Sequence, residues 1–194
     1  EVLNKTAQRR MAVLRPLRLV ITDWPAEADG TPVVDHFEVA NNPENEADGT
    51  RRVAFSGELF IERDDFMAEP PPKFFRLSPG NEVRRRDAYH VTCTGFDVGR
   101  DGEDTTVYAT HDPASKGGNA PDGRKVKSTM HWVSAAHAVP ATVELYERLF
   151  SAEVPGETTG DPIDDVNRGS RKTLTGCMVE AALSDTPLGE VVQL

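Results

Sequence analysis

The sequence predicts an all-β protein, a barrel or a sandwich, and two observations support that prediction. Short runs of β-branched and aromatic residues recur at intervals of roughly ten residues. The 194 residues include 15 glycines and 14 prolines, which supply frequent turns and favour short strands over long helices. The chain has no internal repeat and no low-complexity tract, so short strands packed around a common core are the expected architecture.

The first half of the chain contains four strand-like runs that end at turn residues. They lie at 18–22, 33–39, 52–55 and 58–61. Proline, glycine and asparagine follow or separate these runs. Because these residues favour turn conformations, they mark the expected ends of the strands. Three consecutive prolines at 70–72 should then force an extended backbone into residues 73–77.

The second half continues the same pattern. Further strands are predicted at 83–86, 88–94, 105–110, 125–133 and 142–146. Residues 99–102 should form a hairpin tip, and residues 112–123 a loop. Residues 175–183 are apolar and fit either a helix or a strand.

The charge of the chain is unevenly distributed. The net charge is −10, which by itself argues against nucleic-acid binding. Residues 1–21 nevertheless carry five basic side chains and one acid, whereas residues 22–50 carry eight acids and no Lys or Arg. A local basic cleft can bind RNA while the remaining surface repels other polyanions. Composition alone favours the simpler interpretation, in which these charges are solvated faces.

Signatures of catalysis are absent from the sequence. There is no GxGxxG, no Walker loop and no HExxH. His131 and His137 are six residues apart, a spacing that does not direct them to one metal, so they are interpreted as structural. Asp64 and Asp65 are adjacent acids that should point to opposite sides, in a turn-capping or solvated role. We therefore predict no catalytic residue and no metal ligand.

The two cysteines bear on the compartment. Cys93 and Cys177 lie far apart on apolar segments without a CxxC motif. Buried, reduced thiols in a cytoplasmic protein are expected, with a structural pair as the alternative. No apolar run approaches the roughly 20 residues that a membrane span requires.

Binding chemistry is better represented than catalytic chemistry. An arginine triplet at 84–86 follows the aromatic pair at 74–75. On a strand, Arg84 and Arg86 would share one face, where two guanidinium groups can bind phosphates or a base edge. Such groups, together with aromatic surfaces, bind unstacked RNA bases. The alternative is that the aromatic pair straddles the sheet and the arginines are merely solvated.

Six blocks, taken in order, resemble the glutaminyl-tRNA synthetase family. The blocks are RMAVLRP (10–16), FSGELFIERDDF (55–66), FRLSPG (75–80) with EVR (82–84) and Arg86, DGRKVK (122–127), HWVSAAHAVP (131–140) and LYERLF (145–150). Together they cover most of residues 7–150, and the HWVSAAHAVP block is the most specific. From 151 to 194 the resemblance is weaker.

The resemblance implies the C-terminal anticodon-binding region of that family, made of two small β-barrels. The first would span 10–130 and the second 131–194, with a mobile loop at 151–172 and an incomplete C-terminal end. The expected partners are tRNA(Gln) and an N-terminal catalytic domain of the same, longer polypeptide. That domain would use ATP and Mg²⁺, whereas this region would need no cofactor. DNA and membrane are not expected partners, and a monomer is expected.

The resemblance also assigns roles to individual residues. Arg9 and Gln193 would contact the middle anticodon base, Arg76 the third base or its backbone, and Arg84 the first base with Arg86 as support. The candidate phosphate contacts are Lys73, Arg124, Lys125 and Lys127.

Other positions depart from the family pattern or serve its structure. Phe75 stands where relatives often have Lys. Glu44 stands where some relatives have Asn or Lys, and because an acid cannot bind phosphate, an RNA contact by Glu44 is not expected. His131, Trp132 and His137 would form the junction between the two barrels.

Three alternatives compete with this interpretation. An archaeal or eukaryotic-type glutamyl-tRNA synthetase shares the fold, but the block at 131–140 favours the glutaminyl enzyme. A β-barrel protein-interaction module without RNA binding would suit the net charge of −10. A stand-alone enzyme is disfavoured because no catalytic constellation is present.

Overall fold

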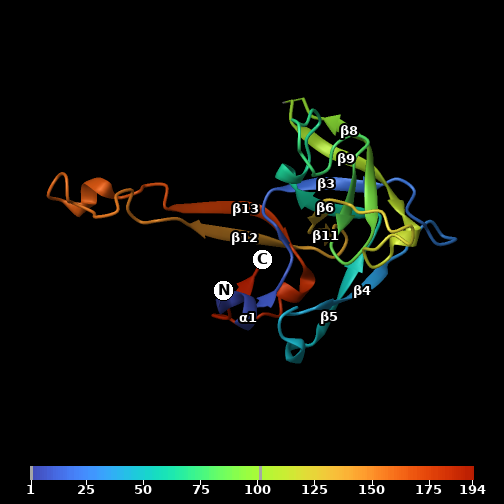
Figure 1. The fold of residues 1–194 in the computed structure, drawn as a ribbon, viewed down its shortest axis with the longest axis horizontal. Coiled ribbons are helices and arrows are strands. Elements are labelled where there is room, and N and C mark those ends of the chain that lie inside the picture. The colour runs from blue at the N-terminus through green and yellow to red at the C-terminus, as the bar shows by residue number, and fades with distance from the viewer. Residues whose placement is uncertain (1, 101) are drawn as a thin grey trace.

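A seven-stranded sheet dominates the computed structural model, which describes residues 2–100 and 102–194. The strand order is β10-β7-β8-β9-β3-β6-β11. The strands are β3 (Pro16–Ile21), β6 (Glu58–Glu62), β7 (Glu82–Arg85), β8 (His90–Val98), β9 (Asp104–Asp112), β10 (Thr129–Met130) and β11 (Val133–Ser134). The sheet curls around its own core (Figure 1), which confirms the all-β, barrel-like prediction.

A two-stranded hairpin, β4 (Asp35–Ala40) and β5 (Thr50–Phe55), packs against the core of this sheet. Phe55 is fully buried, and its ring centroid lies 4.7 Å from that of Trp132, which is also fully buried. The indole Nε1 of Trp132 donates to the backbone carbonyl of Arg86 at 2.9 Å, so the large ring buries no unsatisfied donor. Trp132 therefore belongs to the core.

Alternation of apolar and polar residues places the strands as predicted. In β3, Leu17, Leu19 and Ile21 are buried while Arg18 is exposed. Strands form at each predicted position from 18–22 through 105–110, with ends shifted by a few residues. In the predicted hairpin tip, the N–H of Gly99 donates to the carbonyl of Glu103 at 2.7 Å. Residue 101 of that tip lies outside the described residues.

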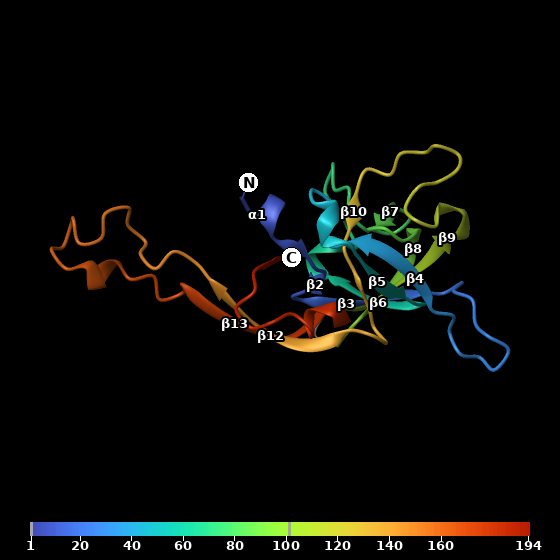
Figure 2. The same ribbon diagram turned by 90° about the horizontal axis from the view of Figure 1, so that it is seen from below.

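A second group of strands brings together distant parts of the sequence. β12 (Val139–Tyr146) and β13 (Arg171–Val179) form a long antiparallel hairpin, the arm, which projects from the body (Figures 1 and 2). β2 (Ala12–Val13) pairs with the base of β13. β1 (Gln8–Arg9), which follows α1 (Val2–Thr6), pairs in parallel with β14 (Val192–Gln193).

These pairings cross the predicted boundary between residues 130 and 131. β2 joins the arm, and β11 joins the seven-stranded sheet. The division into 10–130 and 131–194 stays a proposal. The 3₁₀ helices are η1 (Glu46–Asp48), η2 (Arg63–Asp65), η3 (Pro113–Ser115), η4 (Pro162–Asp165) and η5 (Ala181–Leu183). Within the described residues, no helix is long and apolar enough to cross a bilayer.

Several local predictions need correction. The strand expected at 125–133 is replaced by β10 and β11, two residues each, because residues 125–128 stay outside the sheet and residues 131–132 separate the two strands. The backbone expected to be extended through 73–77 departs from that conformation at Lys73, whose φ is +69°. Arg86 lies beyond the end of β7 in a turn, so the prediction that it shares a strand face with Arg84 is wrong.

Other open points are resolved. Residues 175–183 continue β13 to Val179 and then form η5, so both alternatives are partly right. Cys93 and Cys177 are buried and unbonded to each other, which confirms the reduced thiols. Between Phe150 and Arg171 the chain forms turns and η4, and its mobility remains a prediction.

Candidate nucleic-acid interface

A pocket of about 320 Å³, here called the β1–β14 pocket, brings together three of the five predicted anticodon residues. These are Arg9, Arg86 and Gln193. The complete lining is Arg9, Arg10, Met11, Ala12, Leu14, Glu62, Arg86, His131, Gln193 and Leu194. The pocket combines positive charge with hydrogen-bonding groups from segments far apart in the sequence.

The parallel pairing of β1 with β14 sets the geometry of this pocket. Arg9 is in register with Gln193, so their side chains emerge side by side. The N–H of Arg10 donates to the carbonyl of Gln193 at 2.9 Å. On its other side, the N–H of Arg9 donates to the carbonyl of Asn41 at 2.6 Å. Both predicted middle-base residues are thus held on one short ladder.

The pocket presents an unpaired donor beside an unpaired acceptor. Within the described part of the chain, Arg9 Nε and Gln193 Oε1 are buried and have no hydrogen-bond partner. A buried polar group without a partner costs about 1–3 kcal/mol. Arg9 Nη2 lies 3.8 Å from Glu44 Oε1, so Glu44 neighbours a cation. A base edge offers the complementary donor and acceptor.

A second and larger pocket of about 660 Å³ adjoins the first, between the seven-stranded sheet and the arm. We call it the arm pocket. It shares Leu14, Glu62 and His131 with the β1–β14 pocket. Its full lining is Leu14, Arg15, Glu62, Asp64, Asp65, Arg76, Ser128, Thr129, Met130, His131, Leu145, Lys172 and Leu174. Arg76, the predicted third-base residue, therefore lies next to the middle-base candidates.

Two buried charged residues, Asp65 and Arg85, lie near Arg76. Asp65 Oδ1 is 3.0 Å from Arg76 Nη1, and the Asp65 side chain is only 9% exposed. Arg85 is fully buried, and burial lowers its pKa to about 10, against the opposing effect of Asp65. Burial raises the pKa of Asp65, although the neighbouring Arg85 and Arg76 act in the opposite direction.

The solvated or turn-capping role predicted for Asp65 is wrong, and no role was predicted for Arg85. One signal in the sequence was available. Val83 and Arg85 are two residues apart on β7, so they point to the same face, and both are buried. A strand pattern that places an arginine on the core face requires a carboxylate nearby.

Glu62 forms the wall common to both pockets. Its Oε1 accepts from the N–H of Leu14 at 2.6 Å, and its Oε2 from the N–H of Arg15 at 3.1 Å. His131 Nε2 lies 3.8 Å from Oε1. Burial raises the pKa of Glu62, but His131 and the two backbone N–H groups outweigh it, so the pKa is lowered overall. Glu62 thereby ties β6 to the segment that leads from β2 to β3.

Arg84 lies apart from both pockets. It lines neither of them, and its Nε is buried without a partner within the described part of the chain. The side chain passes beneath Gly118, where an added Cβ would lie 3.3 Å from Arg84 Cδ. Gly118 also has φ +88°, a conformation that favours glycine. The predicted first-base residue is therefore separated from the other four.

The candidate phosphate contacts differ in how free they are. Arg124 pairs with Glu82 at 2.8 Å, with Asp122 at 2.7 Å and with Asp112. Hydrogen bonds to Glu82, Asp112 and Asp122 raise the pKa of Arg124. Lys127 Nζ lies 4.5 Å from the ring centroid of Phe75.

Lys73 and Lys125 are exposed, and Lys73 has φ +69°. The lysines are thus better placed than Arg124 to meet a polyanion.

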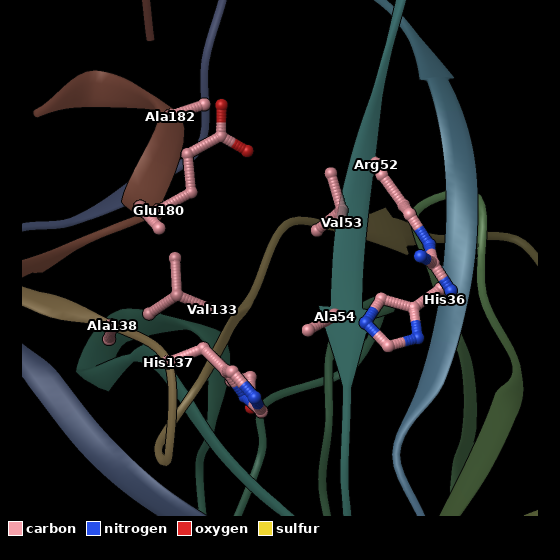
Figure 3. Close-up of a pocket in the computed structure, with 11 residues that line it drawn as sticks. His36, Arg52, Val53, Ala54, Val133, His137, Ala138, Glu180 and Ala182 are labelled. Atoms are coloured by element: carbon pink, nitrogen blue, oxygen red, sulfur yellow. The ribbon is translucent and has the colours of Figure 1, made fainter. Parts of the chain in front are cut away.

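A third pocket, of about 260 Å³, lies on another face and contains none of the predicted site residues. Figure 3 shows His36 and Arg52 across this pocket from Glu180. His137 lines it too, with Nδ1 2.9 Å from Ser134 Oγ. Of the residues expected at the barrel junction, His131 lines the first two pockets, Trp132 is in the core and His137 is exposed.

Comparison with known proteins identifies the family. A family model described as tRNA synthetases class I (E and Q), anti-codon binding domain, matches residues 7–112. A second family model with the same description matches residues 129–194.

Relatives called glutamine–tRNA ligase are similar over most or all of the chain. The protein of Nitrobacter winogradskyi is 49% identical over 193 residues, which is 100% of this chain and 33% of that protein. The Nitrobacter hamburgensis protein is 51% identical over the same share of each. The Pseudomonas putida protein is 41% identical over 184 residues, 94% of this chain and 31% of that protein. The chain spans about a third of the length of these relatives, and it belongs to the family of class I (E and Q) tRNA synthetase anticodon-binding domains.

Proposed function

We propose that this chain is the region of a glutamine–tRNA ligase that binds the anticodon of tRNA(Gln). The complete protein would join glutamine to that tRNA, using ATP. Membership of the anticodon-binding family and the names of the relatives support this function. The single structural observation behind it is the β1–β14 pocket, where an unpaired donor of Arg9 lies beside an unpaired acceptor of Gln193.

In the proposed mechanism, three anticodon bases leave their stack and each meets a different part of the interface. Arg9 and Gln193 contact the middle base, and Arg76 contacts the third base from the neighbouring arm pocket. Arg84 contacts the first base and Arg86 supports it. Guanidinium groups give bidentate contacts to base edges, which is the geometry that distinguishes bases.

Phosphate contacts would add affinity without sequence preference. Lys73, Lys125 and Lys127 are the first candidates. Arg124 ranks last among the four, since it would have to leave three carboxylates to reach a phosphate.

ATP and Mg²⁺ belong to the catalytic part of the proposed protein. Within the described residues, no group of three or more His, Cys, Asp or Glu side chains is arranged to hold a metal ion. We propose RNA binding, without a cofactor, for this region. The proposal includes a monomer in the cytoplasm that works with a catalytic domain of the same polypeptide.

Titration of the 194-residue chain with tRNA tests this function. A tRNA with a CUG or UUG anticodon should bind more tightly than the same tRNA with any anticodon base replaced. A change of the third base from G to C, which gives a glutamate anticodon, separates the glutaminyl from the glutamyl specificity. Equal binding of all these tRNAs, or equal binding of an unrelated RNA hairpin, would refute the proposal.

A single variant tests the role given to Arg84. Arg84→Ala should weaken binding of the cognate tRNA by about 1–3 kcal/mol, the value of one bidentate base contact. Arg52→Ala is the matched control, because Arg52 is an exposed arginine that lines neither the β1–β14 pocket nor the arm pocket. Equal affinity of Arg84→Ala and the unmodified chain in filter binding would remove Arg84 from the interface.

A further inference from the structure

The β1–β14 ladder is too short to be stable by itself. Each strand contributes two residues, and even isolated two-stranded pairs of greater length are marginal in water. This short pairing sets the position of Arg9 relative to Gln193. The geometry of the predicted middle-base contact therefore depends on groups that hold the ladder from outside.

The side chain of Arg10 is placed to do this. Its Nη1 donates to the carbonyl of Arg9 at 3.0 Å and to Asn41 Oδ1 at 3.1 Å. Its Nη2 donates to Gln8 Oε1. The backbone N–H of the same residue donates to the carbonyl of Gln193. One residue thus contacts both strands of the ladder and the segment that flanks it.

Glu180 and Arg51 continue this network into the rest of the fold. Glu180 Oε1 lies 3.8 Å from Arg10 Nε and 2.8 Å from Arg51 Nε. Arg51 Nη2 donates to Glu180 Oε2 at 3.1 Å, and its Nη1 donates to the carbonyl of Ala40 at 3.1 Å. The N–H of Glu180 donates to the carbonyl of Met11 at 3.0 Å. The network links β1, β5 and the start of η5.

The network is costly for stability alone. The side chains of Arg10, Arg51 and Glu180 are 11%, 9% and 5% exposed, so two guanidinium groups share one carboxylate largely out of water. Burial lowers the pKa of Arg10 and Arg51 lowers it further, while Glu180 and Glu190 raise it. Apolar residues of similar volume often stabilise such a site as well or better, so a network of this kind is better explained by the geometry it imposes.

We infer that Arg10 is a positioning residue whose guanidinium, placed beside the Glu180 carboxylate, holds Arg9 and Gln193 in the arrangement that discriminates the middle anticodon base. This inference rests on the proposed function. Arg10 itself need not touch the RNA, because its hydrogen bonds go to the backbone of Arg9 and to the side chains of Gln8 and Asn41.

The test compares discrimination at two anticodon positions. For each protein, affinity is measured for the cognate tRNA, for the same tRNA changed at the middle base, and for the same tRNA changed at the third base. Arg10→Ala should reduce the middle-base preference by about tenfold, within the range of one good base contact. The third-base preference, which depends on Arg76 in the arm pocket, should change by less than about twofold.

Companion variants keep the test decisive. Arg10→Lys retains the charge but not the planar set of donors, so it should also lose middle-base preference. Glu180→Gln removes the charge of the carboxylate in the same network. If Arg10→Ala does not fold, the middle-base preference of Glu180→Gln tests the positioning role in its place. Arg52→Ala, adjacent to Arg51 on β5 but exposed, should leave both ratios unchanged. Circular dichroism and thermal unfolding establish which variants are folded.

The possible outcomes are distinct. An unchanged middle-base preference in folded Arg10→Ala overturns the positioning role, while the anticodon-binding function stands. An equal fall in the middle-base and third-base preferences also overturns the positioning role, because a general loss of structure would reduce both preferences alike. If the unmodified chain shows no preference at either base, the proposed function itself fails, and the inference with it.

Discussion

The seven-stranded sheet and the β1–β14 ladder lie in one chain but are held together by different forces. The sheet encloses a continuous apolar core that includes Phe55, Leu59 and Trp132. Beyond Ser134, the buried hydrophobic residues within the described part of the chain are Cys177 and Val179. The β1–β14 ladder is held by the hydrogen bonds of Arg10 and by the ion pairs of Glu180 with Arg10 and Arg51.

The difference shows how a stable scaffold and a binding surface divide their tasks. Apolar packing yields a rigid body because close-packed side chains have few alternative arrangements. A surface that recognises base edges needs polar groups left unsatisfied until the ligand arrives, and Arg9 Nε and Gln193 Oε1 would be such groups in the proposed function. Such groups cannot be packed into an apolar core, so a polar network fixes their position.

The largest expected effect is in the core. Trp132→Ala removes a fully buried indole and should lower the free energy of unfolding by about 3–5 kcal/mol. Leu149→Ala, at an exposed leucine near the end of β12, should change it by no more than about 0.5 kcal/mol. Denaturant unfolding measures both. Similar losses for the two variants would contradict the assignment of Trp132 to the core that holds the sheet together.

The next effect concerns the two buried charged residues near Arg76. Asp65→Ala removes the carboxylate whose charge opposes the cost of burying Arg85, and it should cost about 3 kcal/mol. Adding Arg85→Met removes the uncompensated charge and should restore most of that loss. A double-mutant cycle in denaturant gives the coupling. If Asp65→Ala costs the same with and without Arg85→Met, the two groups are not coupled.

A smaller, pH-dependent effect is expected at Glu62. The folded protein lowers the pKa of this carboxyl, so its ionised form stabilises the fold above the ordinary value of 4.5, and that stability is lost as the pH falls through the lowered folded value. Glu62→Gln should therefore cost about 1 kcal/mol at pH 7 and progressively less below pH 4.5. Urea titrations across this pH range measure the difference. Glu69→Gln, at an exposed carboxyl, is the control.

The smallest effect is expected at Arg124. Because three carboxylates occupy its guanidinium group, Arg124→Gln should leave the salt dependence of tRNA binding unchanged. Lys127→Gln should reduce the slope of log affinity against log salt by about 1, as loss of one phosphate contact does. A drop of that size for Arg124→Gln would show that the arginine exchanges its carboxylates for phosphate.

The core residues of the sheet could be predicted from the sequence because the alternation of apolar and polar residues along a strand is a local pattern. The spacing of Leu17, Leu19 and Ile21 is sufficient to predict β3 and its buried face. The same rule places Arg85 on the core face, yet it does not identify Asp65 as its neighbour, because that contact joins separate segments. Long-range polar contacts have no local pattern.

The candidate site was predictable only in part, and for the same reason. Resemblance to a family supplied Arg9, Arg76, Arg84 and Gln193, but nothing in composition or periodicity pairs β1 with β14. Two-residue strands carry no periodic signal, and their partners lie far apart in the sequence.

The parallel pairing of Arg9 with Gln193 also dictates an order of events during synthesis. The strands of the seven-stranded sheet are complete once Ser134 has emerged from the ribosome, so its core can fold while the polypeptide is still being made. The β1–β14 pocket cannot close until residue 193 has emerged, and closing so long a loop adds an entropic cost. In a nascent chain, Arg9 is therefore present before Gln193 can pair with it in register. The proposed discrimination of the middle base would therefore be acquired only after the core of the sheet has folded.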